Sequence, residues 1–247
     1  MFPATNAVQF SVSRLVAWAP GVSTDAEWRA WARDERLIER DGAPRLEQMP
    51  AMLRRHAGRL GRMVCDVAYR VLDGATGIPM VLCSRYGEVE RSVDLLSALA
   101  LGTELSPTSF SLSVHNAVGG LFAMARRDTA NCIALAGGDE SAEYGIVETC
   151  GLFSEGAQRV LLVIGDCPLP AIYEEFADVT PLAFAWGCLV SPPGKDAISL
   201  ALSAAPAREH HGLQPPAALA ALRFLLGESG ERTHDAGDRR WRWSRSA

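Results

Sequence analysis

The feature that most constrains this chain is the stretch "CIALAGGDESAEYGIVET" at 132–149, which runs apolar, breaks at two glycines, turns acidic and becomes apolar again. This pattern predicts a short buried strand at 132–136, a turn at 137–138 and a helix at 141–153. The apolar run "RVLLVIG" at 159–165 follows closely and predicts another strand. A strand, a helix and a strand joined by short connections predict two parallel strands of one sheet.

The remainder of the chain extends this α/β pattern. The amino-terminal stretch predicts a first strand rather than a signal peptide, because polar residues and Arg14 interrupt its apolar residues. A buried strand is predicted at 78–85, an amphipathic helix at 88–102 and a further helix at 113–127. Two apolar runs, at 182–190 and 197–203, flank "SPPGKD" and predict a hairpin-like antiparallel pair that closes the sheet. The expected fold is therefore α/β, with a mostly parallel sheet, helices on both faces and antiparallel closing strands.

The chain divides by composition into a main domain at 1–206 and a carboxy-terminal region at 207–247. That region begins with the linker "REHHGLQPP" and continues with "AALAALRFLL" at 217–226, which predicts an unusually apolar helix. It ends in "DRRWRWSRSA", a basic and aromatic segment that we expect to be a disordered tail.

The composition excludes several classes of function. With 247 residues, 48% hydrophobic and 21% charged, the chain has ordinary globular composition, and its net charge of −5 provides no broad surface for nucleic acid. It has no apolar run long enough to insert into a membrane. Its six cysteines include no C-x-x-C pair, which favours reduced thiols and a cytoplasmic location. No metal or cofactor motif is present, and the adjacent His210 and His211 alone are weak evidence for a metal.

The candidate site is the predicted elbow, which comprises Gly138, Asp139, Glu140 and Ser141. Elbows between a strand and a helix often carry a nucleophile. Ser141, however, lacks the G-x-S-x-G frame, and Asp139 and Ser141 suit the start of a helix, where side-chain oxygens accept backbone hydrogen bonds and carboxylates favour the helix dipole. No catalytic residue is predicted here.

The run "CSRYGEVERSVDLLSALALGTELSPTSFSLSVHNAVGGLF" at 83–122, continued through "GGDESAEYG" to "RVLLVIGD", resembles the amino-terminal part of β-ketoacyl synthases. It is most similar to the chain-length-factor-like proteins of bacterial type II polyketide and aryl polyene pathways. The resemblance covers about residues 10–205 and implies a thiolase-like half-fold. It places the nucleophilic cysteine of ketosynthases at Asp139 or Glu140, and it implies that the two catalytic histidines lie in a carboxy-terminal half that this chain lacks.

The resemblance implies a non-catalytic subunit that forms a heterodimer with a ketosynthase, shapes its acyl tunnel and meets acyl carrier protein through the complex. It places Phe110, Ser113, His115 and Asn116 of "SPTSFSLSVHN" at the interface or tunnel. Two other functions stay open: a stand-alone acyltransferase or hydrolase that uses Ser141 or a cysteine, and a scaffold that binds carrier protein. A cofactor is expected for none of them.

The helix predicted at 141–153 has no single polar face, because Glu143 and Glu148 lie on different sides of it. Such a helix must be covered nearly all round. We expect the apolar helix at 217–226 to cover it, with the ketosynthase on a separate edge of the sheet.

Overall fold

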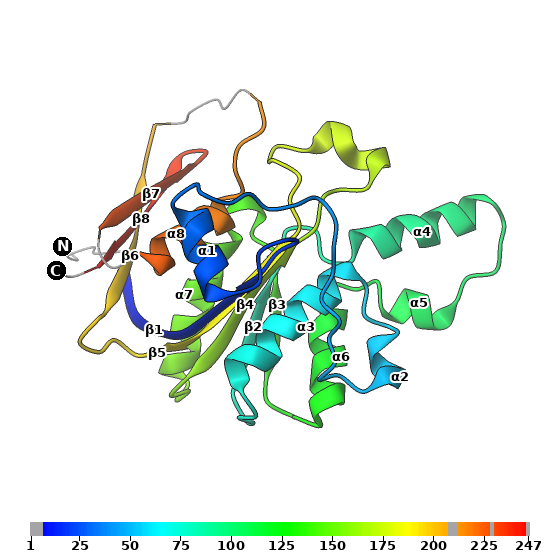
Figure 1. Ribbon diagram of the computed structural model, residues 1–247, viewed down its shortest axis with the longest axis horizontal. Helices are drawn as coiled ribbons and strands as arrows, with labels where there is room; N and C mark the ends of the chain where they lie inside the picture. The colour runs from blue at the N-terminus through cyan, green and yellow to red at the C-terminus, as the bar shows by residue number, and fades with distance from the viewer. Residues whose placement is uncertain (1–6, 207–211, 228–229, 246–247) are drawn as a thin grey trace.

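A computed structural model describes residues 7–206, 212–227 and 230–245. Within these residues, eight strands form one sheet in the order β3-β2-β4-β5-β1-β6-β8-β7 (Figure 1). The strands are β1 (Ala7–Trp18), β2 (Met80–Cys83), β3 (Cys132–Leu135), β4 (Val160–Asp166), β5 (Phe184–Ser191), β6 (Ile198–Ala204), β7 (Glu231–Ala236) and β8 (Arg239–Arg245).

The parallel part of the sheet contains the predicted strand, elbow and helix. β2 lies between β3 and β4, and Met80 is in register with Cys132 on one side and Leu161 on the other. The helix that follows the elbow is α7 (Ser141–Ser154). β3 lies at the edge of the sheet.

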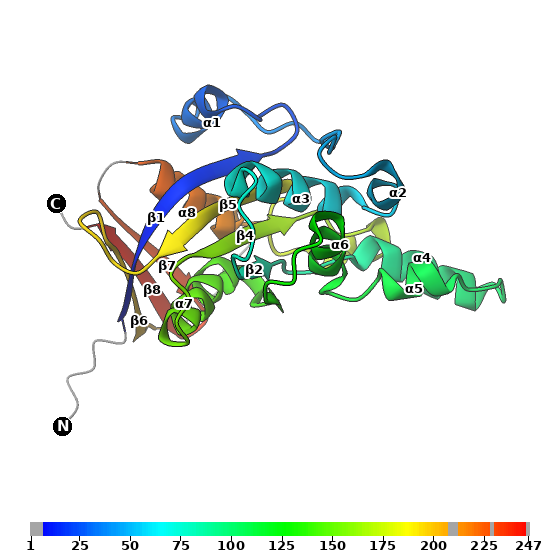
Figure 2. The ribbon, with the colours of Figure 1, turned by 90° about the horizontal axis from the view of Figure 1, so that it is seen from below.

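Helices cover both faces of the sheet, and this part of the prediction is confirmed (Figure 2). Along β4, Leu161 and Val163 pack with α3 (Arg59–Leu72) and α6 (Ala117–Arg126), whereas Leu162 and Ile164 pack with α7 and α8 (Ala217–Leu226). A strand that is buried on both faces needs apolar residues throughout, which explains the uninterrupted run at 160–164.

A glycine allows α7 to lie close to the sheet. A Cβ atom on Gly145 would approach the Cys83 sulfur to 2.6 Å and a methyl group of Leu162 to 3.0 Å. Because real Cβ atoms do not make contacts this short, a side chain at Gly145 would push α7 away from β2 and β4.

Two details of the predicted sheet are wrong. Only two of the seven strand pairings are parallel, β2 with β3 and β2 with β4, so the sheet is mostly antiparallel. β5 and β6 do not form a hairpin-like pair, because β1 lies between them and pairs antiparallel with both. The first strand of the chain therefore lies inside the sheet, between β5 and β6. No local sequence pattern specifies this position.

The carboxy-terminal segment is a strand, not a disordered tail. Residues 239–245 form β8, which pairs with β6 on one side and with β7 on the other. Trp241 and Trp243 point into the core and are 2% and 0% exposed. β6 and β8, which lie on either side of the division predicted at residue 206, are thus hydrogen-bonded neighbours.

Two carboxy-terminal elements cover α7. α8 has the predicted bounds and packs against α7, with residues of both helices in one buried cluster. The β7–β8 hairpin adds an edge-to-face contact between Tyr144 of α7 and Trp241, with ring centroids 5.4 Å apart. The sequence predicted only the helix at 217–226 as the element that covers α7 and did not predict this hairpin.

The other helices lie around this core. They are α1 (Asp25–Ala32), α2 (Ala51–Arg54), α4 (Val89–Ala100) and α5 (Pro107–Ser111), with short 3-10 turns at Gly138–Glu140 and Ala171–Phe176. α4 and α5 have no buried residue, and together they extend away from the body as an arm (Figures 1 and 2). In the described part of the chain, every helix is too short or too polar to span a membrane.

Candidate functional site at the elbow

The elbow turns within three residues of the end of β3. Gly138 has a φ of +58°, a left-handed conformation that favours glycine, and it opens the 3-10 turn that leads into α7. The Ser141 hydroxyl donates to the Gly138 carbonyl at 2.7 Å and accepts from the Gly137 N–H at 3.1 Å. Ser141 is 2% exposed, so its hydroxyl stabilises the turn and is not presented to a substrate.

Glu140 is buried and bound by the β7–β8 hairpin. The Arg239 guanidinium donates to its two carboxylate oxygens at 2.9 and 2.6 Å. The Trp241 indole N–H donates to the same carboxylate at 2.7 Å. With 6% exposure, the Glu140 carboxylate requires such partners, because an unpaired buried charge is very costly.

Asp139 and Glu143 hold His234 between them. The Nε2 atom of His234 lies 3.2 Å from an Asp139 oxygen, and its Nδ1 atom lies 3.1 Å from an oxygen of Glu143. That Glu143 oxygen also accepts from Arg232 at 3.0 Å and from the Trp243 indole at 3.1 Å. The acidic elbow is therefore bound by cationic and indole N–H groups of β7 and β8.

In this cluster, the opposite charges favour the ionised form of His234 and of the two carboxyl groups. Burial disfavours the charged imidazole, but the hydrogen bonds to Asp139 and Glu143 outweigh it and raise the pKa of His234 to about 9. Burial likewise opposes ionisation of the two carboxyl groups, but His234 and the nearby arginines hold the pKa of each below its ordinary value. At neutral pH His234 is an imidazolium that donates from both nitrogens.

This protonation state disfavours His234 as a general base. A general base needs a free lone pair, and both nitrogens of His234 carry protons directed at carboxylates. The elbow contains no thiol, and Cys132 and Cys150 lie at the start of β3 and well inside α7. Burial raises the pKa of both thiols, that of Cys150 to about 11, which disfavours a thiolate nucleophile.

The second predicted group extends from the arm towards the elbow. Phe110 lies on α5 and is 65% exposed, and the Ser113 hydroxyl donates to its carbonyl at 2.8 Å. His115 lies against the body, where Nε2 donates to the carbonyl of Leu135, the last residue of β3, at 3.2 Å. Asn116 precedes α6 and makes no side-chain cap there. His210 and His211 lie outside the described residues.

The hairpin side of the cluster was not predicted. Its members are Arg232, His234, Arg239, Trp241 and Trp243. One signal was available: acidic residues at the start of a helix that must be covered need cationic partners, and the alternation "RWRWSR" near the end of the chain provides arginine together with an inward-facing apolar row.

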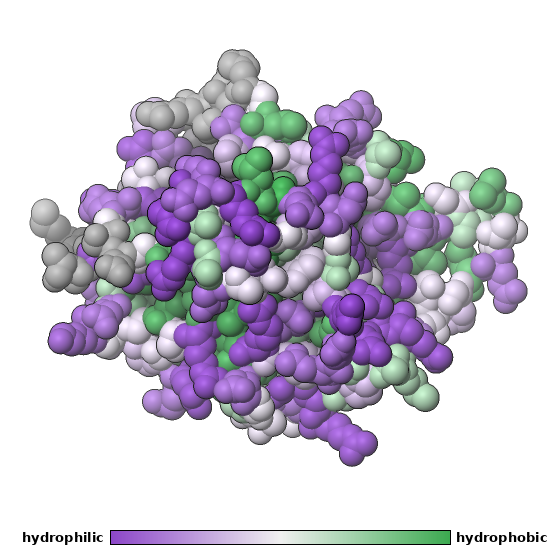
Figure 3. All heavy atoms as spheres, viewed as in Figure 1, coloured by the Kyte–Doolittle hydropathy of each residue, from purple (hydrophilic) through white to green (hydrophobic). Residues whose placement is uncertain are grey.

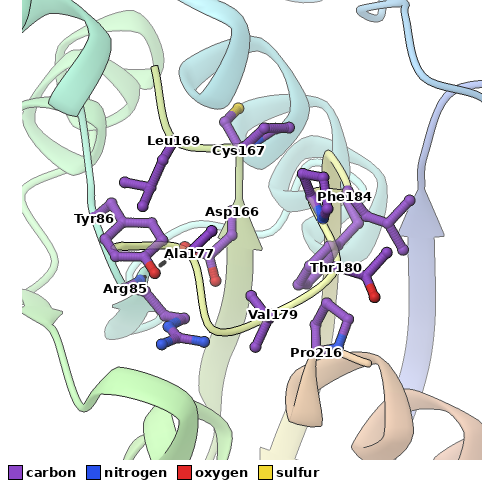
Figure 4. A pocket seen from close by; sticks show the side chains of 13 residues that line it. Arg85, Tyr86, Asp166, Cys167, Leu169, Ala177, Val179, Thr180, Phe184 and Pro216 are labelled. Carbon is purple, nitrogen blue, oxygen red and sulfur yellow. Dashed lines mark hydrogen bonds between the residues drawn. The ribbon is translucent and has the colours of Figure 1, made fainter. Parts of the chain in front are cut away.

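A small pocket lies beside the elbow, between the ends of β2 and β4 and the segment at 177–182 (Figure 4). Its cavity volume of about 30 Å³ holds one or two water molecules and is far too small for an acyl chain.

Comparison with known proteins identifies a family for the sequence and similar solved structures for the fold. Residues 28–244 match the family model described as the beta-ketoacyl synthase, N-terminal domain. No curated protein sequence matches the chain. Among solved structures, a chain of the ketosynthase (ApeO) complex with its chain length factor (ApeC) from Xenorhabdus doucetiae superposes with a TM-score of 0.86 at 24% identity, over 96% of this chain and 100% of that one.

Longer relatives are similar over part of their length. The ishigamide ketosynthase/chain length factor matches with a TM-score of 0.56 at 17% identity, over 80% of this chain and 68% of that one. A beta-ketoacyl synthase from Burkholderia phymatum STM815 matches with a TM-score of 0.59 at 12% identity, over 83% and 66%. The chain thus spans about two thirds of these relatives and has a thiolase-like ketosynthase fold.

Proposed function

Because the chain belongs to the family of β-ketoacyl synthase N-terminal domains, we propose that it is a non-catalytic, chain-length-factor-like subunit that pairs with a ketosynthase. One observation carries this proposal: the polar groups of the elbow are committed to the fold. Ser141 caps the turn, and Asp139, Glu140 and Glu143 are bound by the β7–β8 hairpin. Claisen condensation needs a thiolate and oxyanion donors, and these carboxylates provide neither.

The partner would then supply the cysteine and both histidines, and the arm is a suitable surface for it. Six large apolar side chains in and beside the arm are exposed, and Figure 3 shows apolar side chains at its far end. These residues are Leu96, Leu99, Leu101, Leu105, Phe110 and Val114. Contiguous exposed apolar surface is typical of protein interfaces. The edge strand β3 is a second candidate contact.

Within this heterodimer, Phe110, Ser113, His115 and Asn116 would line the interface or the acyl tunnel, and the chain would limit product length in a fatty-acid-like or polyketide pathway such as an aryl polyene pathway. Acyl chains would arrive on acyl carrier protein bound to the complex. The six cysteines, all within the described residues, are free thiols, which favours the cytoplasm.

The decisive experiment is co-expression with a ketosynthase from the same organism, followed by purification and assay with malonyl and acyl carrier-protein substrates. We expect a stable heterodimer that condenses and an isolated chain that neither condenses nor decarboxylates. Turnover by the isolated chain would overturn the proposal.

Two controls separate the alternatives. Acylating probes directed at serine and at thiols should label neither Ser141 nor a cysteine of the isolated chain; labelling at either would indicate a stand-alone acyltransferase or hydrolase. Co-purification with carrier protein in the absence of a ketosynthase would instead indicate a scaffold.

A further inference from the structure

The arm is joined to the body by two short connections, residues 84–88 and 112–116, which lie against each other. Gly87 of the first connection is buried and has a φ of +56°, a left-handed conformation that favours glycine. A Cβ atom on Gly87 would come within 2.6 Å of the Nδ1 atom of His115, which belongs to the second connection. The imidazole ring therefore lies directly on the glycine backbone, where only glycine leaves room for it.

His115 also binds the strand that leads into the elbow. Its Nε2 atom donates to the Leu135 carbonyl at 3.2 Å. The same carbonyl accepts from the Ser84 N–H at 3.1 Å, at the point where the chain leaves β2. Leu135 is the last residue of β3 and lies two residues before Gly137, where the elbow begins to turn. One imidazole thus joins the second connection both to the first connection and to the end of β3.

The two connections differ in their other contacts with the body. On the first, the Ser84 hydroxyl donates to Asp166 at 2.9 Å, and the Glu88 side chain is only 9% exposed. On the second, the bond from His115 is the only hydrogen bond between residues 112–116 and the sheet within the described part of the chain. Removal of the imidazole should therefore release the second connection and leave the first one in place.

We propose that His115 is a positioning residue that fixes the direction of the arm relative to the elbow. α4 and α5 bury no residue, so their packing holds the arm to the body only weakly and its direction depends on the two connections. An arm with one direction presents its exposed apolar side chains as a preorganised surface, which lowers the entropy cost of binding a partner. This consequence for binding rests on the proposed function, whereas the fixed direction of the arm does not.

NMR of the isolated full chain tests the fixed direction. In the original chain, we expect the residual dipolar couplings of the α4 and α5 amides to fit the alignment tensor of the core strands. In His115→Ala they should no longer fit it, and the order parameters of the arm amides should fall from about 0.85 to below about 0.6. Asn116→Ala removes the neighbouring exposed side chain, which makes no helix cap, and should change neither readout. An arm that still shares the tensor of the core in His115→Ala would overturn the proposal.

Two more variants address the same contact. Gly87→Ala places a methyl group against the imidazole from the other connection and should loosen the arm in the same way. His115→Gln keeps an N–H donor that can reach the Leu135 carbonyl and should recover part of the order that alanine loses. If His115→Ala does not fold, Gly87→Ala and Asn116→Ala still decide: equal arm order parameters in these two variants would reject the proposal.

The consequence for assembly has a separate readout. We expect His115→Ala to weaken the heterodimer about three- to tenfold, because only a fraction of the directions of a mobile arm can bind the partner. An arm that becomes mobile while the affinity for the ketosynthase stays unchanged would remove the arm from the proposed interface, and it would leave the positioning role of His115 supported.

Discussion

The elbow and the arm differ in whether the rest of the chain covers their side chains. At the elbow, three acidic residues are buried or half-buried, and each is bound by a residue that arrives from the carboxy-terminal hairpin. In the arm, α4 and α5 bury no residue, and Leu96, Leu99 and Phe110 are exposed. The chain thus completes the elbow from its own sequence and leaves the arm for another molecule to cover. Stability should depend on the first region and assembly on the second.

The strongest way to break this contrast is to remove the hairpin. Deletion of residues 231–247 exposes the core face that Trp241 and Trp243 cover and leaves Glu140 and Glu143 without the side chains that bind them. Loss of one buried tryptophan side chain alone costs about 3–5 kcal/mol, a large share of the stability of a domain. We expect the truncated chain to be insoluble or to lack the near-UV circular dichroism of a packed core.

Co-expression with the ketosynthase serves as the second arm of this test. A soluble, well-packed truncation that binds the partner would show that the partner can replace the hairpin as the cover of α7.

The next largest effect should come from one buried carboxylate. Glu143→Gln keeps the shape of the side chain but leaves Arg232 without its carboxylate partner and His234 with Asp139 alone. Breaking a buried ion pair from one side costs about 3–5 kcal/mol. Urea unfolding should show this as a lower midpoint. Glu148→Gln, on a partly exposed position of the same helix, is the matched control and should change stability by less than about 0.5 kcal/mol.

The dependence of stability on pH tests the same cluster more finely. The pKa of His234 is about 9 in the folded chain against an ordinary value of 6.5. A raised pKa means that the charged imidazole stabilises the fold, so its contribution, on the order of 3 kcal/mol, is complete below pH 6.5 and is lost as the pH rises towards 9. The lowered pKa values of Asp139 and Glu143 add stability that is lost as the pH falls through the acidic range.

The measurement is the difference in unfolding free energy between the original chain and His234→Gln across this range. We expect the difference to be largest near pH 6 and to shrink by pH 9. A constant difference would mean that His234 contributes packing and no charge.

The sequence predicts the core elements because each carries a local pattern. The strand, glycines and helix at 132–153 appear where the periodicity puts them, and the helix at 217–226 has the expected bounds. β8 also has a local pattern, since Trp241 and Trp243 alternate with Arg240 and Arg242, but its basic composition suggested a tail. Period-two alternation was the better guide there.

The partners of the elbow are harder to predict because they are distant in sequence. His234 and Asp139 are 95 residues apart, and Arg239 and Glu140 are 99 apart. The place of β1 between β5 and β6 is non-local as well. Local patterns fix the faces of a strand but do not select its neighbours, so the residues of the elbow could be found from the sequence whereas its hairpin partners could not.

The smallest effect on stability, and the sharpest separation of the two regions, should come from Phe110→Ala in the arm. Phe110 is 65% exposed, so its loss should change the unfolding free energy of the isolated chain by less than about 0.5 kcal/mol. If the arm packs on a ketosynthase, however, the same side chain becomes buried in the complex, and its removal should lower the yield of heterodimer or change the length of its product. Leu37→Ala, which removes another highly exposed apolar side chain far from the arm in the sequence, controls for general effects on solubility and should leave both readouts unchanged. An isolated chain that Phe110→Ala destabilises would contradict the division between the two regions. Unchanged complex yield together with unchanged products would remove Phe110 from the proposed interface.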